Sequence, residues 1–466
     1  MDKEKVYVIG IFFLTLTTGI TATFIDPLKW WDESVYANLG YDLSKNPLDY
    51  SFKNWGDKSL GADWDKAGFR APLLPYTISL FYISGLEVMI RFIVPVISAI
   101  GVIIVYLIGK ELFNKRLALY ASLFLAFLPV YAFFSGKILA DILATMLMSI
   151  SFLFFWKGFV NNNNKYKYLT GFVTALAILA KYTAMILLPV YIVFFLAMKK
   201  HRRHILEKET WLAFAIFLLA LTPLFLYSIH EYGNPLRLFF HATDAASFWG
   251  GDQSITFLLT EPLYMFSVMI LLGIAGIIII IKNKILLQPR NFILVIWILF
   301  VILSIAMFPH KESRYALMLT PPLVLLGAVS MDAAKRYKQV IPIAVVIVLA
   351  ASTLSLFYYE RLKAENEGSR CFLESMEKLN KEINEDSKAI IFTDQSAKVY
   401  FYTHAPTHFA FNITQLSETE YKNRTVYMFW YYEDEEPIID ISFSLIFSCP
   451  STGTVKAKIF VKEQNA

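Results

Sequence analysis

The residues in this chain best suited to chemistry are two adjacent carboxylates, Asp32 and Glu33. They follow the first long apolar segment by only a few residues. Because charged side chains are costly in hydrocarbon, acids beside a membrane are retained mainly where they have a task. A carboxylate at this place can act as a general base that takes a proton from an attacking hydroxyl or amine. The structural alternative is that both acids cap the helix that follows, since negative charge is favourable at a helix N-terminus.

A second group of ionisable residues falls at positions that we expect to lie at the same face of the membrane. Its members are Arg70, Asp141, Lys181, Lys311, Glu312 and Arg314. The cations in this group can bind a phosphate, and the two acids can support them. A phosphate leaving group gains negative charge as its bond breaks, so fixed cations stabilise the transition state more than the ground state.

Each member of this second group also has a simpler structural interpretation. Arg70 could anchor the chain at the membrane interface. Lys181 could serve only to interrupt the helix at the turn between two spans. Asp141 could cap a helix. Lys311, Glu312 and Arg314 could form a local set of surface ion pairs. These alternatives stay open at the level of sequence.

The composition of the chain is that of a polytopic membrane protein. Its 466 residues are 56% hydrophobic and 17% charged, with a mean hydropathy of +0.50. Apolar runs recur that are long enough to cross a hydrocarbon core of about 30 Å. We predict about eleven spans, at residues 6–25, 90–109, 117–134, 139–156, 167–181, 183–198, 211–229, 262–281, 291–308, 315–333 and 339–357. Segment 6–25 is expected to be retained, because no small-residue cleavage site follows it.

Basic residues cluster in the short loops that fall on one side of these spans. The clusters are Lys110, Lys115 and Arg116; Lys157, Lys165 and Lys167; Lys199, Lys200, Arg202 and Arg203; Lys282, Lys284 and Arg290; and Lys335, Arg336 and Lys338. The positive-inside rule makes this side of the cell membrane cytoplasmic and places the N-terminus there. The net charge of +5 comes mainly from these loops, so we do not expect nucleic acid as a partner.

The sequence predicts two domains. Residues 1–357 form a transmembrane domain, and its long outer loop, residues 26–89, carries the acidic pair. This loop is rich in Trp, Tyr and Pro, which favours helices lying in the membrane interface. Residues 358–466 form a small soluble α/β domain outside the cytoplasm.

The soluble domain combines one helical stretch with strand-like segments. Residues 360–385 are predicted as helix, and residues 389–392, 426–430 and 441–447 as strands. Both cysteines of the chain, Cys371 and Cys449, fall in this domain. Because oxidising compartments favour disulfides, we predict that the two are bonded. Two unpaired small apolar side chains are the alternative.

The ionisable residues are distributed by depth in a way that favours an enzyme over a transporter. None falls near the middle of a predicted span, where a transporter usually binds its substrate. They gather instead at the outer face, where a lipid-borne substrate presents its headgroup. No cofactor is expected with certainty and no metal-ligand spacing is present, although a divalent cation between carboxylates and phosphate is chemically reasonable.

Five short motifs occur along the first 335 residues. They are Trp31-Asp32-Glu33, Arg70-Ala71-Pro72-Leu73, Leu139-Ala140-Asp141-Ile142-Leu143, Ala177 to Lys181, and Lys311-Glu312-Ser313-Arg314-Tyr315 followed by Pro321-Pro322. In this order they resemble the superfamily of dolichyl-phosphate-mannose protein mannosyltransferases and aminoarabinose transferases, which are glycosyltransferases of the GT-C fold. The chain departs from the family at two places. At Arg70-Ala71-Pro72 many members have a basic residue followed directly by prolines, and at Lys181-Tyr182-Thr183 the sequence Lys-Gly-Pro is common.

The resemblance implies a GT-C-like fold and an inverting transfer of a hexosyl or pentosyl group. The donor would be a polyprenyl (dolichyl-type) phosphate sugar, and the acceptor a protein, glycan or lipid at the outer face, with membrane lipids as further partners. The resemblance also places the acid of the first loop near the reaction centre. We therefore expect Asp32, rather than Glu33, to act as the base, with Lys181, Arg314 and either Lys311 or Arg70 at the phosphate.

The main alternative function involves no chemistry. A lipid-linked-sugar flippase or glycan exporter would use the outer charges as an exit vestibule. Loss of transfer on removal of the acidic pair would favour the enzyme.

Overall fold

The computed structural model of the chain describes residues 3–26, 30–55, 66–250, 265–308, 310–333, 340–366, 368–384, 388–409, 424–432, 443–449 and 456–462. The first residues of the predicted span 262–281 and of the predicted strand 441–447 lie outside this part. The chain divides into two compact units. The helical unit comprises residues 1–23, 69–74 and 91–357, and the mixed unit comprises residues 24–68, 75–90 and 358–466.

This division differs in one respect from the predicted domains, 1–357 and 358–466. Most of loop 26–89 groups with the C-terminal residues and not with the helices. That residues 1–357 and 358–466 fold as two separate domains stays a prediction.

The helical unit contains α1 (Lys3–Ala22), α4 (Ile93–Leu112), α5 (Lys115–Ala126), α6 (Pro129–Phe134), α7 (Ala140–Phe155), η4 (Trp156–Val160), α8 (Asn164–Ala180), η5 (Tyr182–Ile186), α9 (Leu187–Ala197), η6 (Lys199–Leu206), α10 (Lys208–Tyr232), α11 (Arg237–Gly250), α13 (Met269–Lys282), α14 (Pro289–Met307), η7 (Ser313–Leu319), α15 (Thr320–Ala333) and most of α16 (Val340–Asn366). Each predicted span overlaps one or two of these helices. Among the described residues, seven helices are long and apolar enough to cross a membrane, or eight if the bent pair η5–α9 and η6 counts as one span. The predicted polytopic helical architecture is confirmed.

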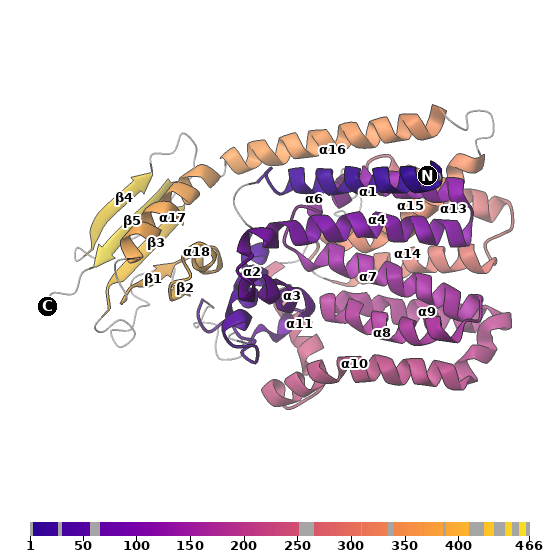
Figure 1. Ribbon diagram of the computed structural model, residues 1–466, viewed down its shortest axis with the longest axis horizontal. Helices are drawn as coiled ribbons and strands as arrows, with labels where there is room; N and C mark the ends of the chain where they lie inside the picture. The colour runs from indigo at the N-terminus through magenta and orange to yellow at the C-terminus, as the bar shows by residue number, and fades with distance from the viewer. Residues whose placement is uncertain are drawn as a thin grey trace. The chain divides into compact units, whose positions relative to one another are not determined.

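Prolines and glycines explain how the helices are broken and packed. The predicted span 117–134 is two helices, because Leu128 adopts an extended conformation before Pro129, as residues that precede proline usually do. Neighbouring helices lie side by side (Figure 1). At the contact of α8 with α10, a Cβ atom on Gly171 would overlap the carbonyl of Ala213. Small residues of this kind allow the close helix packing on which membrane helices depend.

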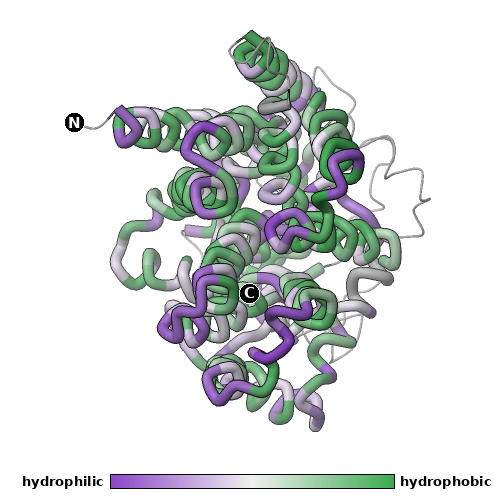
Figure 2. Tube along the Cα trace, turned by 90° about the vertical axis from the view of Figure 1, so that its right-hand side faces the viewer, coloured by the Kyte–Doolittle hydropathy of each residue, from purple (hydrophilic) through white to green (hydrophobic). Residues whose placement is uncertain are grey.

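Contacts between loops gather the predicted basic loops at one end of the helical unit. Glu4, near the N-terminus, accepts 2.6 Å ion pairs from Lys110 and Lys115. Further contacts join Asn161 to Glu111 at 2.6 Å, Arg290 to the Leu112 carbonyl at 3.2 Å, and Lys167 to Glu207 at 2.7 Å. Figure 2 shows hydrophilic colour at the turns nearest the viewer and mostly hydrophobic colour along the helices. The described basic loops therefore share one end, as their charge pattern predicts, whereas Lys335, Arg336 and Lys338 lie outside the described residues.

The mixed unit combines helices from the first loop with a C-terminal sheet. Its helical elements are α2 (Trp31–Lys45), α17 (Ser369–Ile383) and α18 (Ser396–Thr403), while η2 (Ala67–Phe69), α3 (Leu73–Ile83) and η3 (Glu87–Phe92) have residues in both units. Its strands are β1 (Ile390–Thr393), β2 (Thr407–Phe409), β3 (Val426–Tyr432), β4 (Ser444–Cys449) and β5 (Lys456–Lys462). The described strands form one sheet in the order β2-β1-β3-β5-β4. Strand β1 is parallel to β2 and β3, and β5 is antiparallel to β3 and β4.

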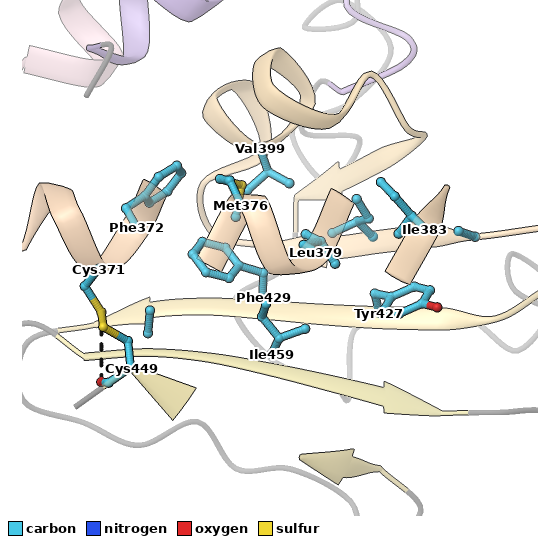
Figure 3. Close-up of a cluster of buried hydrophobic side chains, with 13 residues drawn as sticks. Cys371, Phe372, Met376, Leu379, Ile383, Val399, Tyr427, Phe429, Cys449 and Ile459 are labelled. Atoms are coloured by element: carbon cyan, nitrogen blue, oxygen red, sulfur yellow. Dashed lines mark hydrogen bonds between the residues drawn. A yellow bond between two sulfur atoms is a disulfide. The ribbon is translucent and has the colours of Figure 1, made fainter. Parts of the chain in front are cut away.

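Helix α17 covers the sheet with an apolar face. Its Phe372 and Met376 point toward Phe429 of β3 (Figure 3). A disulfide joins Cys371, in the first turn of α17, to Cys449 at the end of β4, with the Cα atoms 5.8 Å apart. This is the pairing predicted from the sequence, and it holds the helix against the edge of the sheet.

Candidate functional site

Helices α7 and α8 bring a carboxylate and an ammonium group together at the end of the helical unit opposite the basic loops. The two helices are joined by η4 and pack along their length, so the start of α7 lies beside the end of α8. Asp141 lies in the first turn of α7, and Lys181 directly follows α8. Each charge suits its helix end, because helix N-termini favour anions and C-termini favour cations. The two side chains form an ion pair.

The segment around η7 adds a second ion pair to this site. Arg314 donates to Glu312 at 2.7 Å, and the same carboxylate oxygen lies 2.8 Å from Nε2 of His310. The ring of Tyr315 lies between the two pairs. Its centroid is 4.7 Å from the Lys181 ammonium and 5.6 Å from the Arg314 guanidinium. The structure thus brings together four residues predicted from widely separated motifs: Asp141, Lys181, Glu312 and Arg314.

Two further lysines make this region rich in buried positive charge. Lys311 is 5% exposed, and Lys137, in the turn before α7, is 3% exposed. Lys and Arg are rarely buried to this degree unless they are paired or bind a ligand. Together with the two ion pairs they give a cationic cluster, which we define as Lys137, Asp141, Lys181, Lys311, Glu312 and Arg314. The cluster brings together cations from three segments of the chain, an arrangement suited to binding an anion.

Arg70 lies beside the cationic cluster through its backbone. Its carbonyl oxygen accepts a 3.2 Å hydrogen bond from the hydroxyl of Tyr182, the residue after Lys181. Its guanidinium lies 5.3 Å from the ring centroid of Phe69. The backbone of Arg70 is therefore tied to the turn that carries Lys181, while its side chain packs on an aromatic ring.

The two acids of the first loop begin helix α2 in the mixed unit, and they differ in environment. Glu33 is fully buried, and its carboxylate accepts a 3.1 Å hydrogen bond from the Trp30 backbone N–H. It therefore caps the helix, which is the structural alternative that the sequence left open. Asp32 is partly exposed in the same first turn. Of the two carboxylates, Asp32 is the more accessible.

Helix α2 is held by contacts to C-terminal residues of the mixed unit. Asp42, near the end of α2, accepts hydrogen bonds from Tyr400 at 2.7 Å, Asn54 at 3.1 Å and Trp55 at 3.2 Å. Burial raises the pKa of the Asp42 carboxyl, and these three donors oppose the increase. At the other end of the helix, the ring of Trp31 meets Phe409 edge-on, with centroids 6.5 Å apart. Both ends of the helix that carries Asp32 are thereby fixed.

The sequence motifs gave Lys137 no role. Tyr315 was quoted only as part of a motif, and Tyr182 only as a departure from one. A lysine within an otherwise apolar stretch was the available signal for Lys137. In the described ranges no group of three or more His, Cys, Asp or Glu side chains could hold a metal ion.

Comparison with known proteins identifies the fold of the chain. Residues 69–227 match the family of dolichyl-phosphate-mannose-protein mannosyltransferases. The chain is similar to ArnT from Cupriavidus metallidurans, solved with bound undecaprenyl phosphate, at 13% identity and a TM-score of 0.73 over 98% of both chains. The chain has the GT-C fold. The fold expected from the sequence motifs is therefore confirmed.

A second similarity extends to a larger protein of the same fold. The GT-C chain is similar to the archaeal oligosaccharyltransferase AglB from Archaeoglobus fulgidus, solved with an inhibitory peptide and a dolichol-phosphate. The identity is 12% and the TM-score 0.61, over 92% of this chain and 70% of AglB. No curated protein matches the chain by sequence. The family match at 69–227 includes Arg70, Asp141 and Lys181, whereas Asp32 and η7 lie outside it.

Proposed function

We propose that this chain is a membrane glycosyltransferase that moves a sugar from a polyprenyl phosphate to an acceptor, with inversion at the anomeric carbon. The observation that carries the proposal is the convergence of Lys181 and Arg314 on the ring of Tyr315, with each cation held by a carboxylate. Two cations held close together suit a phosphate, because hydrogen bonds from Lys and Arg to phosphate oxygens are charge-assisted and strong. The GT-C fold and the family match to residues 69–227 support the same reaction class.

The proposed reaction is a single displacement. An acceptor hydroxyl or amine attacks the anomeric carbon, and the bond between that carbon and the phosphate oxygen breaks on the opposite side. The acceptor's proton passes to a carboxylate, and polyprenyl phosphate leaves with the electron pair of the broken bond. Negative charge therefore grows on the phosphate, where preorganised cations lower the barrier.

We assign the phosphate to Lys181 and Arg314, with Lys311 and Arg70 as further donors of positive charge. Asp141 and Glu312 hold Lys181 and Arg314 in place before the donor arrives. Because these side chains are largely shielded from water, their attraction to phosphate is stronger than it would be at an exposed surface. The supporting acids also limit the cost of burying the two cations without a ligand.

We assign the general base to Asp32. Glu33 already accepts a backbone N–H as the cap of α2 and is fully buried. Asp32 has the same chemistry in a more accessible place, at the start of a helix whose two ends are fixed. A helix N-terminus also favours the ionised form that a base requires.

The neighbours inform the substrates that we propose. ArnT was solved with undecaprenyl phosphate, and AglB with a dolichol-phosphate and a peptide. We propose a polyprenyl phosphate carrier for this chain and an acceptor that is a protein, glycan or lipid. We further propose that the N-terminus and basic loops are cytoplasmic and that the cationic cluster faces the outer leaflet.

The test is transfer from a polyprenyl-phosphate sugar by purified protein carrying Asp32→Asn. The amide keeps the shape and removes the base, so turnover should fall about 10²–10⁴-fold with normal folding. The matched control is Asp49→Asn, which removes a carboxylate of the same unit that pairs with Lys53. The control should keep near-normal turnover. Near-normal turnover of Asp32→Asn would end the assignment and make Glu33→Gln the next candidate.

The same preparation distinguishes the transporter alternative. A flippase or exporter reconstituted in vesicles would move labelled donor between leaflets and release no free polyprenyl phosphate. A transferase given donor and acceptor should release polyprenyl phosphate in equal amount to the glycosylated product.

A further inference from the structure

The helical unit carries a strongly basic surface at the end opposite the cationic cluster. Helix η6 turns by 117° from the span that precedes it. Its four cations, Lys199, Lys200, Arg202 and Arg203, are all exposed, whereas His201 and His204 of the same helix are buried. We define these four cations as the basic platform. Helix η6 is thus amphipathic, with its charges on one face.

The buried side of η6 is fixed by polar contacts and aromatic packing. Nδ1 of His201 lies 3.2 Å from the Phe159 carbonyl. Nδ1 of His204 lies 2.8 Å from the Glu207 carboxylate, which also pairs with buried Lys167 at 2.7 Å. The carboxylate that follows η6 in the chain is therefore engaged on the inner side. It is not directed at the platform.

The platform's own charges are left without internal compensation. Across the ranges that the structure describes, no carboxylate forms an ion pair with any of its four cations. Within the same ranges, the one hydrogen bond made by their side chains joins Nε of Arg202 to the Leu196 carbonyl at 2.7 Å, which caps the end of α9. Four like charges within five residues repel one another, so a counter-charge from outside the chain would stabilise them.

Apolar side chains around the platform indicate where that counter-charge lies. Leu206, in the last turn of η6, is 84% exposed. Leu196 on α9 is 54% exposed, and Trp211 on α10 is 59% exposed. Exposed apolar side chains on either side of a basic helix, with a tryptophan at the edge, are typical of a segment at the boundary between acyl chains and headgroups. Clusters of four or more basic residues beside a span attract anionic lipids.

We propose that the basic platform binds the headgroups of anionic phospholipids in the leaflet at its end of the helical unit. The occupant has negative phosphate groups for Lys199, Lys200, Arg202 and Arg203, and acyl chains for Leu206 and its neighbours. This site is separate from the proposed sugar-donor site, because the two lie at opposite ends of the helices. Its role is to hold the turn between α9 and α10 in the membrane interface.

The test uses the full-length protein in nanodiscs that mix phosphatidylcholine with phosphatidylglycerol. Lipids within reach of the protein are reported by a fluorophore on Leu206→Cys, because the native cysteines are bonded to each other. Brominated phosphatidylglycerol should quench the fluorophore more strongly than brominated phosphatidylcholine at equal mole fraction. Equal quenching by both lipids would overturn the proposal, and this measurement needs no substitution in the platform.

A second arm removes the platform's charge. The variant carries Lys199→Gln, Lys200→Gln, Arg202→Gln and Arg203→Gln, and its preference for the anionic lipid should fall by roughly fivefold for each charge removed, about 1 kcal/mol each. The matched control replaces four cations of internal ion pairs, by Arg361→Gln, Arg370→Gln, Lys378→Gln and Lys381→Gln. The control should keep the wild-type preference. A platform variant with the wild-type preference, or a control that loses it equally, would refute the site.

Discussion

Replacing Lys181 with methionine should separate its structural contribution from its proposed role at the phosphate. Met keeps much of the apolar stem and removes the ammonium group. Asp141 would then remain 5% exposed and would lose its ion-pair partner. Loss of one partner from a buried pair typically costs 3–5 kcal/mol. The Lys181 side chain is 17% exposed, and the start of α7 stabilises the remaining carboxylate by up to about 1 kcal/mol. We therefore expect about 2–3 kcal/mol of destabilisation.

A second substitution should recover the stability but not the function. In Lys181→Met with Asp141→Asn, the orphaned charge is removed, so stability should return to within about 1 kcal/mol of the wild type. Donor binding should not recover, since a hydrogen bond to a charged group contributes about 1.5–3 kcal/mol. That range corresponds to a loss of roughly 10- to 150-fold in kcat/KM for the donor. The Michaelis constant for the acceptor should change little.

The assay combines apparent melting temperature in nanodiscs with transfer kinetics at varied donor and acceptor. The matched control is Lys378→Met with Glu382→Gln, which removes an exposed ion pair of α17 expected to contribute only about 0.3–0.5 kcal/mol. If the double variant at Lys181 and Asp141 recovers donor kinetics together with stability, Lys181 is a structural residue only. If Lys181→Met is as stable as the wild type, the reasoning from a buried pair is wrong.

Two further predictions concern the mixed unit. Cys371→Ser should lower the stability of this unit by about 4 kcal/mol in the chain-entropy account, because the disulfide closes a loop of 78 residues. Transfer by the folded protein should be retained. Thiol counting that finds two reactive cysteines in unreduced, unfolded wild type would contradict the bond. Folding raises the pKa of Asp42, so its contribution to stability is fully present below about pH 4 and is lost as the pH rises through the folded pKa. Melting temperature measured from pH 4 to 7 should therefore fall for the wild type relative to Asp42→Asn, and a rise would refute burial as the dominant cause.

Hydropathy and charge in the sequence were sufficient to predict the helices and the ends at which their loops lie. Each predicted span overlaps a helix, because crossing hydrocarbon requires a continuous apolar run that any single segment displays by itself. The same holds for the gathering of the described basic loops at one end, since the alternation of sides follows from the order of the spans. Lys181 was also placed between two helices, as the structure has it. The disulfide followed from the number of cysteines and their shared domain.

The pairing of charges was decided only by tertiary structure. Asp141 and Lys181 are separated by 40 residues, and Arg314 reaches the same site from a different part of the chain. Their spacing in the sequence does not indicate how far apart they lie in the folded chain. The capping role of Glu33 likewise became clear only from its hydrogen bond with the Trp30 backbone N–H.

The association of the first loop with the C-terminal residues was also invisible in the sequence. Asp42 and Tyr400 are 358 residues apart, yet their hydrogen bond helps to fix the helix that carries Asp32. A local pattern reports whether a segment prefers helix, strand or membrane, because those preferences arise from neighbouring residues and the solvent. Which buried polar group meets which partner depends on the path of the whole chain, so only the folded structure decided how the candidate base is held.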